Sequence, residues 1–494
     1  MIWAWQKITE TFKSIVNWEG VLRMKQSKRQ MTVGLIVANR GFFPGWLVED
    51  GKRKLLNVIE SMGVKVITLT ERETKYGAVG NLQDAEKCAN LFKQHAGEID
   101  GIVVTLPNFG DERSAAGAVR LSGLHVPVLV HAFPDEVDKL DLQHRRDSFC
   151  GKVSLCNNLV QYQIPFTDTT YHTEAVDSGQ FKKDFQDFLA ICRIVRGVKN
   201  LKIGVVGTRP TAFNTVRFSE KILERSGISV ETIDLSEIIA RANKFDSASA
   251  QYKEHLQKLK DTFKPSNVPE RSLDKMARLS VILNEWIEEN QVSAVAIQCW
   301  TALEAIYGIV PCAVMSMLSE SLIPSACEAD VMGALSMYVL QLASNKPSAL
   351  MDWNNNFKEE EDKAIMFHCS NFPISFFESC QMSHQDIIAG TVGQENTYGT
   401  CVGRVSPGPA TFLRLSTFDN EGTIVSVIAE GRFTEDNVKT FGGYGVVEIP
   451  NLRGLLKVIT QNGFEHHVAV SKSTVGDVVR ETIERYLGWK IISY

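Results

Sequence analysis

The sequence predicts an α/β protein with two doubly wound parallel-sheet domains followed by a β-rich, barrel-like C-terminal domain. Twice along the chain, apolar stretches of strand length alternate with amphipathic helical stretches. After Asp352 they give way to short strands separated by Gly, Pro, Asp and Asn. With 494 residues, 44% of them hydrophobic, the chain is long enough for about three domains. We place the boundaries at residues 1–30 for an N-terminal extension, then 31–170, 171–350 and 351–494.

The first α/β domain alternates four apolar strands with three helices. We expect strands at 32–38, 64–69, 101–105 and 126–130, and helices at 47–62, at 84–95 and around Ala115. Strands that are apolar on both faces require helices on both sides of the sheet. This pattern therefore favours a parallel sheet over an antiparallel one.

The second α/β domain follows a long helix at 181–195. We expect strands at 201–207, 229–234, 294–298 and 313–315, and helices at 213–226 and 329–342. The charged stretch 244–273 is interpreted as solvated helix and connection. Apolar residues recur near helical spacing after Ala329, so Glu328 is expected to begin the last of these helices.

The C-terminal domain is predicted to be mainly antiparallel. Its expected strands are 364–369, 400–405, 411–415, 423–427 and 445–449, and a further strand opens at His466-His467. A final helix at 475–487 would close the chain, with Ser473 or Thr474 as its N-cap.

Composition excludes several classes of function. The formal net charge is −5 and no basic stripe is present, which argues against nucleic acid as a partner. The ten cysteines include no CxxC pair and indicate reduced, mostly buried thiols in a soluble cytoplasmic protein. No apolar run in residues 1–30 reaches the length of a signal peptide or membrane span. We expect an extra helix or upstream extension there, with a peripheral membrane helix as the weaker alternative.

Gly204 and Gly207 raise the alternative of a dinucleotide site. The full fingerprint needs three glycines opening a helix and an acidic residue about twenty positions on. Here the third glycine is absent and Pro210 follows the turn. An ordinary strand-to-helix turn is therefore the preferred interpretation.

Carboxylates and histidines that are far apart in the sequence suggest one metal site. Glu328 and Asp352 would supply anionic oxygens, and an imidazole from His466 or His467 would narrow the choice towards manganese-like ions. Each residue also has a structural interpretation. Glu328 is suited to the first turn of a helix and Asp352 to a turn, while a core position is the default for His368. Adjacent residues of a strand point to opposite faces, so at most one of the two terminal histidines can face the site.

The arrangement of these residues resembles that of the L-fucose isomerase family from about Met31 to the end. Glu328 and Asp352 lie 24 residues apart, and the stretches Phe367-His-Cys-Ser-Asn371, Gly403-Arg-Val-Ser-Pro-Gly-Pro409 and His466-His-Val468 look like that family's C-terminal domain. The related L-arabinose isomerases likewise carry a terminal His-His pair and a further ligand histidine at a place similar to His368. The local sequence around Glu328, Ser-Ala-Cys-Glu-Ala-Asp, differs from that of the best-known fucose enzymes.

This resemblance implies a manganese-dependent aldose–ketose isomerase, with other divalent cations possible. Glu328 and Asp352 would be both metal ligands and proton carriers in a reaction through a cis-enediolate. Among the histidines, His467 would be the metal ligand, with His466 as the alternative ligand. His368 would be an outer partner of the site.

Neutral and aromatic side chains are expected to line the sugar pocket. Gln298 and Trp300 follow a strand at the carboxyl edge, where open α/β sheets bind ligands. Arg40 and Phe43 follow the first strand in the same way. The resemblance implies that they reach a neighbouring subunit's site in a homo-oligomer, with a hexamer suggested. Core packing for Trp300 and a surface ion pair for Arg40 stay open as equal alternatives.

Two rival functions stay open on sequence grounds. One is a nicotinamide-dependent oxidoreductase, and the other is a non-catalytic, two-lobed sugar-binding protein. The sugar itself is also open: a 6-deoxyhexose, a pentose or an acid-substituted hexose would fit.

Overall fold

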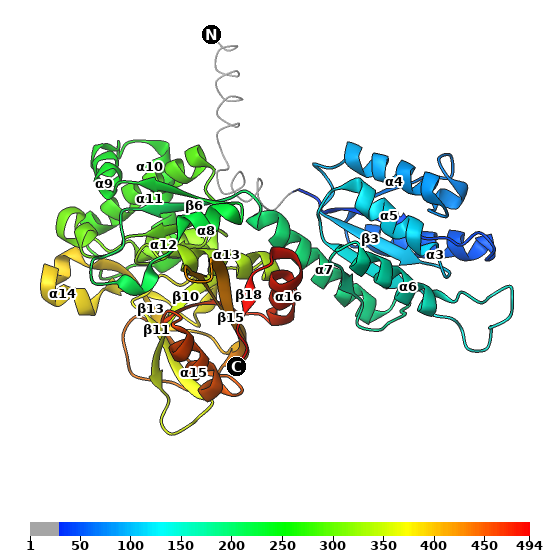
Figure 1. Ribbon diagram of the computed structural model, residues 1–494. Coiled ribbons are helices and arrows are strands. Elements are labelled where there is room, and N and C mark those ends of the chain that lie inside the picture. Colours follow the sequence, from blue (N-terminus) through cyan, green and yellow to red (C-terminus); the bar gives the residue numbers. More distant parts are fainter. Residues whose placement is uncertain (1–28) are drawn as a thin grey trace, which may run out of the picture.

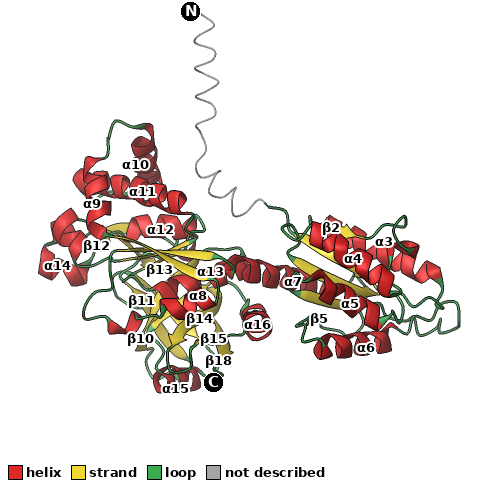
Figure 2. Cartoon of the chain, turned by 45° about the horizontal axis from the view of Figure 1, so that its top comes forward, coloured by secondary structure: helices red, strands yellow, loops and turns green. Residues whose placement is uncertain are grey.

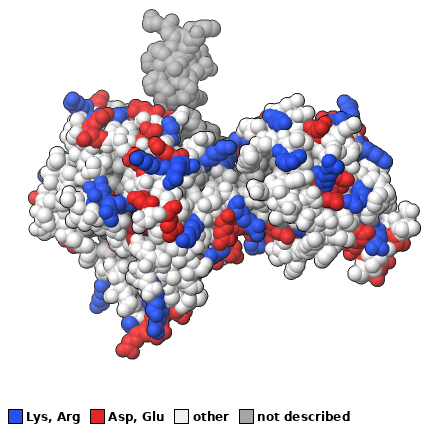
Figure 3. Space-filling model, in the orientation of Figure 1, with Lys and Arg blue, Asp and Glu red and all other residues white. Residues whose placement is uncertain are grey.

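The computed structural model describes residues 29–494, so the expected N-terminal extension lies outside the described residues except for Arg29 and Gln30. Two lobes are visible (Figures 1 and 2). A long helix, α7 (Gly179–Val198), runs between the N-terminal α/β lobe and a larger lobe that holds everything after it. On the face drawn in Figure 3, Lys and Arg are interspersed with Asp and Glu and form no continuous basic surface.

The N-terminal lobe is a parallel sheet with the strand order β2-β1-β3-β4-β5. Its strands are β1 (Thr32–Val37), β2 (Lys65–Thr68), β3 (Gly101–Leu106), β4 (Val128–Ala132) and β5 (Thr167–Asp168). One face packs on α4 (Leu82–Gln94), α5 (Glu112–Ser122) and α6 (Ser148–Gln161), and the other on α3 (Gly45–Ser61) and α7. Each face has its own apolar cluster, which confirms the doubly wound prediction.

The second parallel sheet has the order β7-β6-β8-β9. Its strands are β6 (Leu201–Val206), β7 (Ile228–Ile233), β8 (Ala294–Ile297) and β9 (Ser325–Ala326). One face packs on α9 (Leu235–Lys244), α11 (Glu270–Asn290) and α12 (Cys312–Glu320), with α10 (Ala250–Phe263) outside them. The other face packs on α7, α8 (Glu220–Arg225) and α13 (Val331–Ser344). This sheet confirms the second predicted α/β unit.

Three expectations for this region are wrong. Residues 313–315 lie in α12, not in a strand, because a short apolar run does not distinguish a strand from a fully buried helix. The expected helix 213–226 is broken: a 3-10 turn at Asn214–Val216 precedes α8. Glu328 does not begin α13. It lies in the preceding loop with a φ of 56°, and Asp330 is the N-cap, accepting a hydrogen bond from Gly333 N at 2.8 Å.

The C-terminal part contains a closed barrel within one nine-stranded sheet. Strands β16, β11, β10, β17, β14 and β15 follow one another, all antiparallel, and a β15–β16 pairing closes the ring. This confirms the barrel-like prediction. The strands of the sheet are β10 (Ser348–Asn356), β11 (Lys363–His368), β12 (Gln381–His384), β13 (Tyr398–Arg404), β14 (Gly408–Phe418), β15 (Thr423–Phe433), β16 (Gly443–Glu448), β17 (His467–Ser471) and β18 (Lys490–Ile491).

The barrel starts earlier than the sequence suggests, because β10 begins at Ser348. Asp352 is therefore the middle residue of a strand rather than a turn residue, and the expected boundary at 350/351 falls inside β10. Two further helices belong to this part, α14 (Asp386–Val392) and α15 (Leu452–Asn462).

The closing helix is α16 (Gly476–Glu481), continued by a π-helical turn at Thr482–Leu487. Neither Ser473 nor Thr474 caps it; the N-cap position is Val475. The Glu430 carboxylate of β15 instead accepts from Gly476 N at 2.6 Å, a tertiary cap that local sequence does not reveal. Over residues 29–494, no helix has both the length and the apolarity to cross a membrane.

Candidate metal centre

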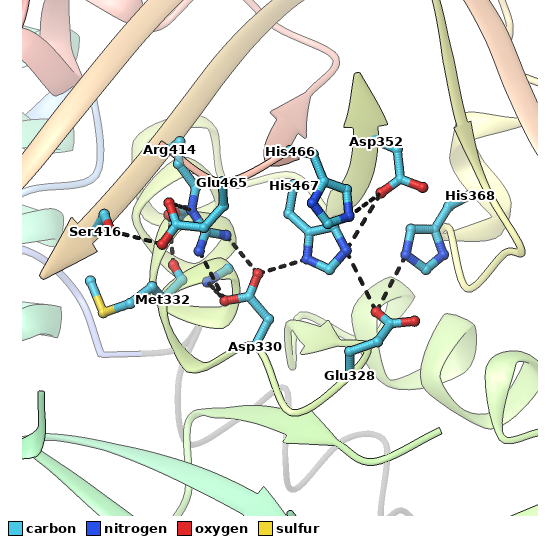
Figure 4. Close-up of polar contacts among 12 residues, drawn as sticks. Glu328, Asp330, Met332, Asp352, His368, Arg414, Ser416, Glu465, His466 and His467 are labelled. Atoms are coloured by element: carbon cyan, nitrogen blue, oxygen red, sulfur yellow. Dashed lines mark hydrogen bonds and ion pairs between the residues drawn. The ribbon is translucent and has the colours of Figure 1, made fainter. Parts of the chain in front are cut away.

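The candidate metal centre lies where the loop after β9 meets three neighbouring barrel strands (Figure 4). Glu328 comes from this loop, Asp352 from β10, His368 from the end of β11 and His467 from the start of β17. Asp352 and His467 are directly paired across β10 and β17. Because paired residues of antiparallel strands share a face, the barrel aims both side chains at Glu328.

The potential ligand atoms lie close together. His467 Nε2 is 3.6 Å from Glu328 Oε2 and 3.5 Å from Asp352 Oδ1, and His368 Nε2 is 3.6 Å from Glu328 Oε2. Glu328 Oε2 and Asp352 Oδ1 are buried and have no hydrogen-bond partner within the described residues. Buried carboxylate oxygens are costly to leave unpartnered, so their convergence suits a positively charged ligand.

These donors fit a divalent cation. Ligand atoms about 2.1 Å from an octahedral ion lie about 3 Å apart when adjacent and about 4.2 Å apart when opposite. The observed separations of 3.5–3.6 Å fall between these values. In two overlapping groups, one ligand atom from each residue lies within 4.8 Å of the others: Glu328, His368 and His467, and Asp352, His466 and His467. Carboxylates with imidazoles suit manganese-class ions better than soft ones.

Protonation in this cluster reflects burial and mutual charge. Burial raises the pKa of Asp352, although the imidazoles of His368 and His467 oppose this. Burial disfavours the charged ring of His467, yet the hydrogen bond and charge of Asp330 outweigh it and raise the His467 pKa. A metal-ligating nitrogen must be unprotonated, so a cation and protons would compete for this ring.

A buried network behind His467 orients its ring (Figure 4). Asp330 Oδ2 lies 2.8 Å from His467 Nδ1 and accepts a hydrogen bond from it, which directs Nε2 towards Glu328 and Asp352. Arg414 donates to both oxygens of Asp330 at 2.6 and 3.1 Å, and to Glu465 at 2.9 Å. The sequence analysis missed Asp330, Arg414 and Glu465. The available signal was a charged residue inside the apolar strand run Thr411-Phe-Leu-Arg-Leu415.

The two terminal histidines are less separated than strand alternation suggests. His466 Nε2 lies 3.8 Å from Asp352 Oδ1, and its ring centroid is 4.5 Å from that of His467. His466 precedes β17, so the strict alternation of a strand does not apply to it, and both rings reach Asp352. They differ in exposure: the His467 side chain is buried, whereas that of His466 is 41% exposed.

Aromatic side chains line the approach to this cluster. Trp300 Nε1 donates to Glu328 Oε1 at 3.0 Å, so the predicted pocket residue directly contacts the carboxylate. Phe213 was not predicted. Its half-buried ring lies 5.8 Å from that of Trp300, 5.3 Å from His466 and 5.6 Å from His467, measured between centroids.

The position of the Gln298 side chain explains why the residue that follows β6 is a glycine, Gly207. Gln298 Oε1 accepts from Thr208 N at 2.9 Å, and a Cβ on Gly207, which has a φ of 80°, would approach that oxygen to 2.5 Å. A Cβ on Gly204 would meet the Trp286 ring of α11 at 2.6 Å. Packing therefore accounts for both glycines, and no helix opens at this turn as a dinucleotide fingerprint requires.

Arg40 and Phe43 lie between β1 and α3 in the N-terminal lobe, whereas the other predicted site residues belong to the larger lobe. Arg40 forms an ion pair with Glu112, donates to Gly110 O at 2.9 Å and stacks 4.0 Å above the Phe109 ring. Its contacts within the described chain are thus local.

Comparison with known proteins gives the family. Residues 34–199 match the family described as "Fucose/sulfoquinovose isomerase, N-terminal domain", and residues 366–494 match "L-fucose isomerase, C-terminal domain". Together these ranges cover more than half of the chain, and they include His368, His466 and His467. The chain belongs to the L-fucose isomerase-like family, as its resemblance suggested.

Curated relatives agree with this placement. The chain is 27% identical over 297 residues to the sulfoquinovose isomerase of Clostridium sp. (strain MSTE9), covering 59% of this chain and 64% of the relative. It is 25% identical over 312 residues to that of Alkalicoccus urumqiensis, covering 62% and 68%. For Priestia megaterium (strain ATCC 12872 / QMB1551), identity is 25% over 227 residues, covering 46% and 50%. The match therefore spans less than two thirds of the first relative's length.

Proposed function

We propose that this chain is a metal-dependent aldose–ketose isomerase. The observation that carries the proposal is the meeting of two buried, unpartnered carboxylate oxygens, on Glu328 and Asp352, with the Nε2 atoms of His368 and His467. Family membership supports the reaction class. The relatives' names support a sugar as the substrate.

Glu328, Asp352 and His467 would hold a manganese-class cation. When bound, this cation supplies positive charge to the oxygens of the two reacting sugar carbons. His368 Nε2 lies as close to Glu328 as His467 Nε2 does, which supports a place for His368 beside these ligands. Trp300 holds the other oxygen of Glu328 and so restricts its rotation.

The carboxylates would also move the proton. Isomerisation removes a proton from the carbon beside the carbonyl and returns it to the neighbouring carbon, through an enediol form of the sugar. Glu328 and Asp352 come from different elements, so each can face one of the two reacting carbons, one as base and the other as acid. Proton transfer by a positioned group contributes typically about 10²–10⁴-fold.

The sugar is proposed to be an acid-substituted hexose. All three relatives above are named sulfoquinovose isomerase, which favours this choice over a 6-deoxyhexose or a pentose. Phe213 and Trp300 present ring surfaces for the sugar beside His466. Gln298 would serve the pocket mainly by fixing the turn at Thr208.

We further propose that a neighbouring subunit completes the pocket with Arg40 and Phe43. Large apolar side chains are exposed in this lobe, including Phe42, Trp46, Phe149 and Tyr171. Exposed large apolar side chains mark a protein interface where they adjoin one another. A hexamer fits the family resemblance. The ten free cysteines suit a reducing compartment, so we place the activity in the cytoplasm.

A screen of aldoses with added manganese tests this function. The purified chain is incubated with sulfoquinovose, 6-deoxyhexoses and pentoses, and ketose formation is followed with and without a chelator. We expect turnover of one class, abolished by chelation. Reduction of a nicotinamide by any of these sugars would support the oxidoreductase rival. Tight sugar binding without any turnover would support the binding-protein rival.

A further inference from the structure

Four thiols gather behind the candidate metal centre. Cys299 follows β8, Cys312 begins α12, Cys327 follows β9 and Cys369 follows β11. The Cys327 thiol forms side-chain contacts with the thiols of the other three. Cys299, Cys312 and Cys327 are buried, and Cys369 is partly exposed. Four separate segments thus bring their sulfur atoms to one place, although the sequence shows no clustered cysteine motif.

Two of these thiols form a donor group with Glu328. Cys299 Sγ lies 3.4 Å from Glu328 Oε1, and the ligand atoms of Cys299, Cys327 and Glu328 all lie within 4.8 Å of one another. The opposite oxygen, Oε2, faces His368 and His467. The Glu328 carboxylate therefore stands between a nitrogen–oxygen site and a sulfur-rich site.

The spacing suits a tetrahedral ion. With a metal–sulfur bond of about 2.3 Å and a metal–oxygen bond of about 2.0 Å, tetrahedral angles place the two ligand atoms about 3.5 Å apart. The Cys299–Glu328 separation of 3.4 Å agrees with this value. Cys312 and Cys369, both in contact with Cys327, are neighbours from which a fourth ligand can come.

The thiol cluster also contacts a second residue of the candidate centre. Cys369 Sγ lies 3.3 Å from His368 Nδ1. Sulfur atoms thus contact Glu328 through Cys299 and His368 through Cys369.

We propose that Cys299, Cys327 and Glu328 Oε1 form a second cation site, specific for a thiophilic divalent ion of the zinc class. Soft thiolate ligands select such ions over manganese or magnesium. Binding releases the two thiol protons to solvent and leaves two thiolates on the ion. Because the site shares Glu328 with the isomerase centre, its occupation would inhibit that centre. The site itself does not depend on the proposed activity.

Cadmium titration of the metal-free full-length chain tests the site. A cadmium–thiolate bond gives an ultraviolet charge-transfer band that oxygen and nitrogen ligands do not give. We expect the band to saturate at one ion per chain. Cys299→Ser and Cys327→Ser should each weaken cadmium binding at least about tenfold, on the scale of altered metal ligation. Cys88→Ser, which alters a buried thiol of α4 in the N-terminal lobe, is the matched control and should keep the band.

X-ray absorption on the unmodified chain with one equivalent of zinc tests the same site without any variant. We expect two or more sulfur neighbours around the zinc. A first shell made only of oxygen and nitrogen would overturn the proposal, as would an undiminished cadmium band in the folded Cys299→Ser/Cys327→Ser double variant. Failure of the aldose screen would leave these readouts unaffected, so the two proposals fail separately.

Discussion

At the residue scale, Glu328 and Asp330 illustrate how neighbouring acids acquire different roles. Glu328 has an unpartnered oxygen directed at two histidines, whereas Asp330 is fully paired with Arg414, His467 and the start of α13. The charge of Arg414 outweighs the burial of Asp330 and keeps the pKa of Asp330 far below its usual range. Asp330 is therefore a positioning residue, while Glu328 is available to a ligand.

Replacing Asp330 should weaken metal binding through His467. Asp330→Ala leaves Arg414 with only Glu465, and breaking a buried ion pair typically costs about 3–5 kcal/mol of the free energy of unfolding. Asp330→Asn keeps the shape and is expected to retain the fold with about 10–100-fold weaker manganese binding. Manganese titration and urea unfolding separate the two effects. Unchanged manganese affinity in folded Asp330→Asn would contradict the positioning role.

Replacing the two terminal histidines should affect different properties, manganese binding for His467 and turnover for His466. His467 is buried and fixed by Asp330, so His467→Ala is expected to lose most of the manganese affinity. Burial and the adjacent His467 charge lower the pKa of His466 to about 4, so its partly exposed ring is neutral near pH 7. His466→Ala should spare manganese binding and reduce turnover. Titrating manganese into both variants tests this assignment. Weaker manganese binding by His466→Ala than by His467→Ala would mean that His466 is the ligand.

At the scale of elements, apolar periodicity predicted the strands and helices well but not the contacts between them. The apolar run around 102–104 forms β3 as predicted, and the strand is buried along its whole length. The same kind of run at 313–315 proved helical, since only its packing between α11 and the barrel decides its form. The Asp330–Arg414–Glu465 network was unpredictable because Arg414 lies 84 residues from Asp330 and 51 from Glu465, and the three meet only through tertiary packing.

The π-helical turn η3 (Leu303–Tyr307) carries a buried acid whose titration should be measurable. Within the described residues neither oxygen of Glu304 has a hydrogen-bond partner, and burial raises its pKa to about 8. A folded pKa above the unfolded one gives stability that is complete below pH 4.5 and is lost as pH rises towards 8.

Glu304→Gln should therefore raise the free energy of unfolding more at pH 8 than at pH 5. The difference should grow by about 1.4 kcal/mol for each pH unit over which the carboxyl is protonated in the folded state and ionised in the unfolded state. Glu359→Gln, on an exposed residue, is the control and should show no such dependence on pH. Urea unfolding at both pH values provides the comparison. Equal effects of Glu304→Gln at the two pH values would mean that Glu304 has an ordinary pKa.

At the scale of the whole molecule, the sequence predicted three domains but gave no measure of how far the N-terminal lobe lies from the candidate centre. Arg40 and Phe43 follow β1 as expected, yet they contact their own lobe. The assembly proposed above would bring them to the candidate centre of a neighbouring copy. The exposed side chain of Phe42, 80% accessible, is the most direct probe of that assembly.

Phe42→Glu should dissociate the assembly and lower turnover together. A charge at an apolar interface must be desolvated, which costs several kcal/mol when it finds no partner. Ile387→Glu, at an exposed apolar position on α14 in the other lobe, serves as the control and should leave the assembly intact. Sedimentation combined with activity measurements tests this. A fully active monomer of the unmodified chain would exclude the interface role of Arg40 and Phe43.

The most direct test of the central claim combines metal binding and turnover in Glu328→Gln and Asp352→Asn. Each change keeps the side-chain shape but removes a charge, a ligand and a proton carrier. We predict about one manganese ion per subunit in the unmodified chain. In each variant we predict a loss of several orders of magnitude in aldose–ketose turnover, with the fold retained. Near-normal turnover in either variant, with manganese still bound, would contradict the assignment of this centre.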